Sequence, residues 1–131
     1  MGIELGIKGE KEITVERAHL ASSLGSGLVD VFATAMMIAY MEAICVESVQ
    51  PHLSEGQTTV GVHIDVAHLA ATPLGMKVRF TSELAEISPN GKGLLFNVEA
   101  RDEKDVIGKG TVKRVIVAKA TFESRTRGKK I

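Results

Sequence analysis

Apolar residues fill residues 31–49, VFATAMMIAYMEAICVESV, on nearly every side of a helix, so the pattern predicts one long buried helix. Glu42 is the only charged residue between positions 35 and 46. Burying an isolated carboxylate is costly, so we expect Glu42 either to pair with a cation or to take part in chemistry. Pro51 disfavours helical geometry in the residue before it, which predicts the end of the helix.

Alternation of apolar and polar residues predicts strands around this helix. The first is an interrupted strand over residues 3–15, broken at Gly9 to Glu12. In the strand after the helix, the even-numbered positions from Thr58 to His68 share the apolar face, and Gly61 falls on the other face. The last strand shows a slip of parity, which predicts a β-bulge near Gly108 to Arg114. The four strands after the helix are expected at residues 56–68, 76–84, 94–100 and 106–122, with tight turns at residues 88–91 and 102–105.

The order of these elements is one strand, one helix and then four strands. An antiparallel sheet with one apolar face must cover that face, and the long helix is the apolar element available. We therefore predict an α+β hotdog fold, with a five-stranded antiparallel sheet wrapped around one long central helix. A single domain over residues 1–131 is expected, in which the basic residues from about 124 to 131 form a solvated, disordered tail.

Composition narrows the function classes. The 16 Lys and Arg residues balance the 16 Asp and Glu residues, so nothing points to a nucleic-acid partner. Cys45 is the only cysteine, which excludes an intrachain disulfide and fits a reducing cytoplasm. The first residues resemble no signal peptide, and the long apolar run is too short and too interrupted to span a membrane. A cytoplasmic location without membrane contact is therefore expected, with Cys45 as an inert packing residue.

The segment from Arg17 to Asp30 is rich in Ser and Gly. It lacks the GK[ST] ending of a phosphate-binding loop and the GxSxG spacing of a serine nucleophile. A plain loop or a lid is the predicted role. The three methionines of the helix, Met36, Met37 and Met41, are expected in the core. No metal site is predicted, because His19, His52 and His63 do not cluster with cysteines or carboxylates.

Two segments, VFATAMMIAYME and TTVGVHIDVAHLAATPLGMKV, resemble the fluoroacetyl-CoA-type thioesterases of the hotdog superfamily. The resemblance implies hydrolysis of an acyl-CoA thioester to an acid and free CoA, with no cofactor beyond the CoA of the substrate. It implies Thr34, Glu42 and His68 as catalytic residues and Gly61 as the point where the backbone approaches the acyl group. The fluoroacetyl-specific member closes its pocket with aromatic side chains, whereas the loop ASSLGSGLVD has none, so the reaction class is carried over and the substrate is not.

In this scheme Glu42 and His68 form the base or nucleophile pair, and the Thr34 hydroxyl is a donor. Each residue also has a structural alternative. Thr34 could cap the helix, Glu42 could pair with a buried arginine such as Arg114, and His68 could be a polar strand end. The alternative for the whole chain is a noncatalytic hotdog module that binds acyl-CoA or dimerises.

Thr34 and Glu42 are separated by about 12 Å along a straight helix and by about 80° around it. Both can therefore attend one thioester only if Thr34 lies in a non-helical segment or if a second subunit contributes one of them. A five-stranded sheet also leaves an edge that needs cover. We therefore predict a homodimer, or a dimer of dimers, with composite sites at a two-fold interface.

Overall fold

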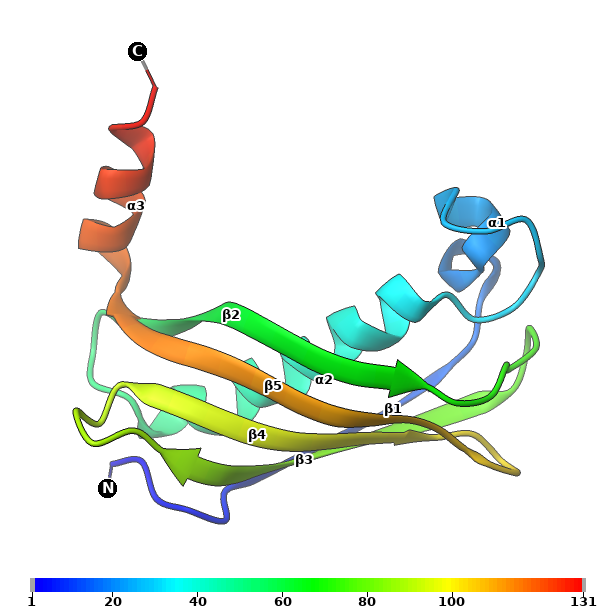
Figure 1. Cartoon of the computed structure of the whole chain (residues 1–131), viewed down its shortest axis with the longest axis horizontal. Helices are drawn as coiled ribbons and strands as arrows, with labels where there is room; N and C mark the ends of the chain where they lie inside the picture. The colour runs from blue at the N-terminus through cyan, green and yellow to red at the C-terminus, as the bar shows by residue number, and fades with distance from the viewer. Residues whose placement is uncertain (1, 131) are drawn as a thin grey trace.

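The computed structural model describes residues 2–130 and confirms the predicted hotdog architecture. Five strands form one antiparallel sheet in the order β1-β3-β4-β5-β2. The helix α2 lies across one face of this sheet, while α1 and α3 lie at opposite ends of it (Figure 1). In chain order the elements are β1 (Lys8–Thr14), the 3₁₀ turn η1 (Arg17–His19), α1 (Ala21–Leu24), α2 (Thr34–Val49), the 3₁₀ turn η2 (Gln50–His52), β2 (Gln57–His68), β3 (Lys77–Ile87), β4 (Gly93–Arg101), β5 (Val106–Ala118) and α3 (Lys119–Arg127).

The core lies between α2 and the concave face of the sheet. Met37 and Met41 are fully buried and Met36 packs against them at the edge, which confirms their predicted place in the core. They meet the inward side chains of the central strands, which alternate with outward polar residues as the sequence pattern predicts. These inward residues are Val78, Phe80 and Leu84 of β3, Leu94, Phe96, Val98 and Ala100 of β4, and Ile107, Val112 and Ile116 of β5.

The prediction that α2 is buried on every side is wrong. The helix begins at Thr34, and one of its faces is open: Thr34, Ala35 and Ala39 are exposed, and Glu42 is half-buried. The single sheet covers only the opposite side of the helix. Val31 and Phe32 precede the helix in an extended segment, in which Phe32 forms a bridge with Leu20. This open face of α2 is accessible to a ligand or to a second chain.

The predicted break in the first strand is also wrong, because Gly9 to Glu12 lie inside β1. Within residues 2–130 this strand stands at one edge of the sheet with β3 as its one neighbour, so its charged residues reach solvent. Gly9 is needed there for a packing reason. A Cβ at this position would lie 2.8 Å from the Ile44 carbonyl oxygen, so glycine lets α2 approach the strand.

The prediction that the even-numbered residues of β2 face inward holds only for the second half of the strand. Its register against β5 shifts between Gly61 and His63, which makes Val62 the extra residue of a bulge. Before the bulge, Thr59 is buried and Gly61 faces Glu42 of α2; after it, the even-numbered residues up to His68 are the less exposed ones. Val62 itself is 58% exposed. The bulge therefore lets Gly61 and His68 face the same side, although their numbers differ in parity.

The bulge predicted in the last strand near Gly108 to Arg114 lies at Ile107, directly before that range and opposite the step from Ala100 to Arg101. From Gly108 to Arg114 the pairing of β5 with β4 is regular, and its pairing with β2 shifts opposite the Val62 bulge. The apparent slip arose because Arg114 takes an inward position, in line with Val112 and Ile116.

The end of the chain also differs from the prediction. The strand β5 ends at Ala118, and the predicted continuation to Phe122 is part of the helix α3 instead. This helix is exposed along its length and rises away from the sheet (Figure 1). The basic residues Arg125 and Arg127 are therefore solvated as predicted, but within a helix rather than a disordered tail.

The two predicted turns are confirmed. Gly91 has a φ of 78°, which glycine adopts readily, in the turn between β3 and β4. Asp102 accepts hydrogen bonds from the backbone N–H groups of Lys104 and Asp105 in the turn between β4 and β5. Within residues 2–130, no helix has the length and apolar character needed to cross a bilayer.

Candidate active site

The Thr34 hydroxyl and the His68 ring meet at the N-terminus of α2. Thr34 Oγ1 and His68 Nδ1 are 2.7 Å apart and hydrogen-bonded. Ala33 is the N-cap residue and no side chain caps the helix, so the alternative of Thr34 as a helix cap is wrong. His68 is the last residue of β2 and faces the helix as predicted, although it does so through the bulge at Val62 rather than through one unbroken parity along the strand. Two elements that are far apart in sequence therefore present one polar pair.

The second ring nitrogen of His68, Nε2, is buried and has no hydrogen-bond partner among the described residues. Burial of the ring lowers the pKa of His68 below its usual value, because the charged form loses solvation. His68 is therefore neutral at pH 7, with one nitrogen engaged by Thr34 and the other available to a ligand. A buried nitrogen without a partner is costly in the free protein, and a ligand or water that bonds to it relieves that cost.

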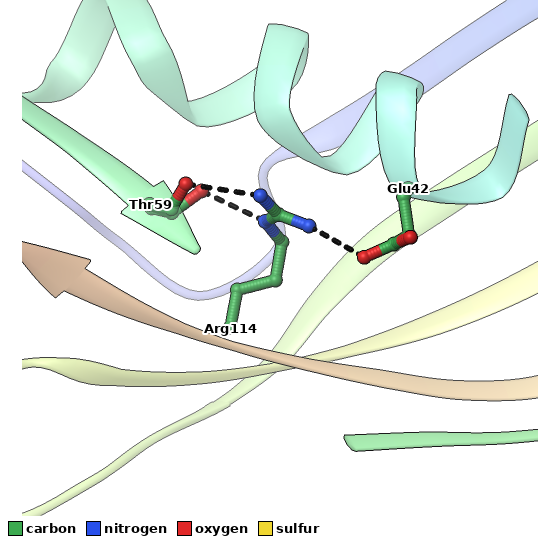
Figure 2. Close-up of polar contacts among 3 residues, drawn as sticks. All are labelled: Glu42, Thr59 and Arg114. Carbon is green, nitrogen blue, oxygen red and sulfur yellow. Dashed lines mark hydrogen bonds and ion pairs between the residues drawn. The ribbon is translucent and has the colours of Figure 1, made fainter. Parts of the chain in front are cut away.

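Glu42 lies two turns further along α2 and pairs with Arg114 of β5. Arg114 Nη1 donates to Glu42 Oε2 over 2.9 Å, while its Nε donates to Thr59 Oγ1 over 2.8 Å and its Nη2 to the Thr59 carbonyl oxygen over 3.0 Å (Figure 2). The Arg114 side chain is 8% exposed and that of Glu42 is 36% exposed. Thr59 of β2 thus fixes the Arg114 guanidinium, which in turn holds one oxygen of the Glu42 carboxylate. The rest of the Glu42 carboxylate faces solvent.

Gly61 lies directly beside this ion pair. A Cβ at position 61 would overlap Glu42 Oε2 and would lie 3.2 Å from Arg114 Nη1. Glycine therefore lets the carboxylate reach the strand backbone. The approach of the Gly61 backbone to the acyl group stays a prediction; within the chain, the group next to Gly61 is the Glu42 carboxylate.

The predicted residues thus form two clusters within one chain, Thr34 with His68 and Glu42 with Gly61. The helix is regular from Thr34 to Glu42, so the predicted spacing between these two residues along the axis holds. The Glu42–Arg114 pair, weighed above as an alternative to catalysis, is present. The sequence named Arg114 as a possible partner of Glu42, but it did not indicate Thr59, which fixes the Arg114 guanidinium through its hydroxyl and its carbonyl oxygen.

Cys45 takes no part in this chemistry. It is buried in the core, and burial raises the pKa of its thiol to about 12, so the thiol stays protonated. The prediction of an inert packing residue agrees with this. Among residues 2–130, no three His, Cys, Asp or Glu side chains gather in an arrangement that could hold a metal ion.

Comparison with known proteins identifies the family. The family model for fluoroacetyl-CoA-specific thioesterases, FlK, matches residues 15–120, a range that includes α2 and the strands β2 to β5. The chain belongs to this family. It is therefore a thioester hydrolase of the hotdog fold that acts on acyl-CoA thioesters. The resemblance seen in the sequence motifs is confirmed.

Members of this thioesterase family align over most of the chain. The fluoroacetyl-CoA thioesterase of Streptantibioticus cattleyicolor is 39% identical over 100 residues, which cover 76% of this chain and 70% of that protein. The structure of the fluoroacetyl-CoA thioesterase FlK is 31% identical, covers both chains completely and has a TM-score of 0.92. A threonine-to-serine variant of FlK in complex with acetyl-CoA is 30% identical, with a TM-score of 0.91 over 98% of this chain and 100% of that one.

Proposed function

We propose that this thioesterase hydrolyses its acyl-CoA substrate in the cleft beside Thr34 and His68, with Glu42 supplying the attacking base or nucleophile. The observation that carries this proposal is the Thr34–His68 hydrogen bond, which leaves His68 Nε2 buried and unpartnered on the open side of α2. A module that only dimerises would gain nothing from a costly unpaired nitrogen at this place, whereas a site that receives a ligand would.

The N-terminus of α2 favours negative charge near Thr34. When water or a carboxylate attacks the thioester carbon, the carbonyl oxygen becomes an oxyanion, and the Thr34 hydroxyl and the helix N-terminus are suited to stabilise it. Collapse of this intermediate breaks the C–S bond. The proton that the base takes from water then passes through His68 Nε2 to the CoA sulfur, which completes the exchange of acyl-CoA and water for an acid and free CoA. In this scheme His68 Nδ1–H donates to Thr34 Oγ1, which leaves the Thr34 hydroxyl proton free for the oxyanion.

Glu42 serves as a general base that takes a proton from water, or as a nucleophile that forms an anhydride which water then cleaves. The contacts of its carboxylate suit both roles. One oxygen is held by Arg114, and the side chain keeps enough exposure to meet a substrate. Gly61 leaves the space that this orientation needs.

We further propose that two copies of the chain form the working unit. The strand β2 is 12 residues long and stands at the edge of the sheet, with β5 as its strand neighbour within residues 2–130. Pairing of β2 with β2 of a second copy across a two-fold axis would satisfy its free backbone groups. It would also bring a second sheet towards the open face of α2, so that Thr34 and Glu42 of different subunits border one cleft.

The direct test is release of free CoA from acetyl-CoA and longer acyl-CoAs, followed with a thiol reagent. We expect turnover that Thr34→Ala and His68→Ala each reduce strongly. Binding of acyl-CoA without release of thiol would support the noncatalytic alternative instead.

The composite site is tested by mixing inactive variants under conditions of subunit exchange. Because Thr34 and His68 are bonded within one chain, Thr34→Ala mixed with His68→Ala should regain no activity, which makes this mixture the control. Thr34→Ala mixed with Glu42→Gln should regain about one quarter of wild-type activity, since half of the dimers are mixed and each has one intact site. No recovery despite proven exchange would place Thr34 and Glu42 of one chain in the same site.

The proposed reaction needs neither a metal nor a redox cofactor, because the protein groups named above supply the base, the acid and the oxyanion contact. The cytoplasmic location stays a prediction from the single cysteine.

A further inference from the structure

A cleft of about 740 Å³ opens beside Thr34 and His68. Its walls are α2, the loop after α1 and the turn after β2, so it begins at the polar pair and runs between two connecting segments. None of the described residues that line it carries a formal charge at neutral pH, and its polar side chains are Ser26, Thr34 and His68. The rest of the lining is apolar.

Aliphatic side chains are exposed at the mouth of this cleft. Val29 in the loop after α1 is 61% exposed, and Leu69 directly after His68 is 57% exposed. Ile38 on α2 is half-buried, and Phe32 closes the floor with no exposure at all. Apolar surface in this amount next to a reactive pair gains stability when an apolar ligand covers it.

We propose that this cleft is the acyl-chain site and that it selects aliphatic acyl groups longer than acetyl, with Val29 and Leu69 as the residues that determine specificity. The inference rests on the proposed function, because it places the thioester at Thr34 and His68. The same lining disfavours acyl groups that end in a carboxylate, since a charge buried there meets no cation.

The size of the preference for longer acyl chains follows from the burial of their methylene groups in the cleft. Full burial of one methylene is equivalent to about a fourfold gain in kcat/KM, and partial burial in an open cleft to about twofold. Hexanoyl-CoA has four methylenes more than acetyl-CoA. The ratio of their kcat/KM values is therefore expected between about 16 and 250.

The test measures kcat/KM of the full chain for acetyl-, butyryl-, hexanoyl-, octanoyl- and succinyl-CoA. In the wild-type protein we expect kcat/KM to rise from acetyl to hexanoyl, with succinyl-CoA far below butyryl-CoA. Val29→Ser and Leu69→Ser should each lower the ratio of hexanoyl to acetyl by about fivefold. Leu28→Ser is the matched control, because Leu28 is 99% exposed and does not line the cleft, so the ratio should stay at the wild-type value.

A flat or falling dependence on chain length, with acetyl-CoA still hydrolysed, would overturn the acyl-chain inference and leave the proposed function intact. Wild-type turnover of acetyl-CoA by Thr34→Ala and His68→Ala would instead remove the proposed function, and the inference with it. If Val29→Ser or Leu69→Ser weakens self-association while the chain-length ratio stays unchanged, these residues contact a second copy and the inference fails. Should either serine variant not fold, Val29→Thr and Leu69→Asn provide the same comparison.

Discussion

Replacement of Glu42 by Gln separates the chemical role of the carboxylate from its structural role. The amide oxygen of Gln can still accept from Arg114 Nη1, so the substitution removes the charge and keeps the contact. A hydrogen bond to a charged group contributes about 1.5–3 kcal/mol and a neutral one about 0.5–1.5 kcal/mol. Because the Glu42 side chain is 36% exposed, solvent screens the pair and the loss of stability should be about 1 kcal/mol.

That loss corresponds to a fall in Tm of about 3–5 °C for a domain of this size. The loss of turnover should be far larger, since a general base contributes about 10² to 10⁴ to the rate. We would measure urea unfolding for the first quantity and release of CoA thiol for the second. Near wild-type turnover in Glu42→Gln would refute a catalytic role, and the Arg114 pair would then be the whole reason for this acid in α2.

Arg114→Met provides the companion measurement. It removes the three hydrogen bonds that Arg114 donates and leaves Glu42 without its cation. We expect a loss of about 2–3 kcal/mol in the free energy of unfolding, because a charged group that is 8% exposed is lost together with its contacts. A double-mutant cycle with Glu42→Gln should show coupling of at least about 0.5 kcal/mol; strict additivity would mean that the ion pair contributes nothing.

Three further results are expected. Gly61→Ala should lower kcat by about tenfold or more with a small change in stability, because the Cβ of the new alanine must displace the Glu42 carboxylate. Unchanged kinetics would show that the carboxylate has freedom to move. Burial lowers the pKa of His68, so its neutral form persists at pH values below the usual pKa of histidine. The acid limb of the pH profile of kcat/KM should therefore lie below about pH 6.5. An acid limb above that pH would contradict the inferred environment of the ring. Burial alone would raise the pKa of Asp102, but hydrogen bonds from the turn amides and from Thr72 lower it below its usual value. The ionised carboxylate therefore stabilises the fold at pH values above its unfolded-state pKa, and this contribution disappears as the pH falls through its folded-state pKa. Asp102→Ala should therefore cost about 2 kcal/mol at pH 7 and progressively less in acid; a cost independent of pH would point to packing alone.

Local pattern was enough for the fold. Alternation along β3 and β4 identified the inward residues from Val78 to Ala100, and the turn residues identified both hairpins. The unbroken apolar run predicted one helix, and a sheet with one apolar face has to pack on it. The alternation pattern failed at two places. The charged residues of β1 were interpreted as a break in the strand, and the bulge of β2 at Val62 cannot be recognised from alternation alone.

The sequence by itself determined the residue types of the site and the distance between Thr34 and Glu42, because both lie on one regular helix whose geometry is constant. Only the tertiary structure decided which side chains are partners. The bulge at Val62 brings Gly61 to Glu42 and His68 to Thr34 on the same side of the strand, and the inward turn of Arg114 supplies the cation for Glu42. The physical reason is that these contacts join residues from 19 positions apart (Glu42 and Gly61) to 72 positions apart (Glu42 and Arg114), so they depend on the register and bulges of the whole sheet rather than on any local preference of the chain.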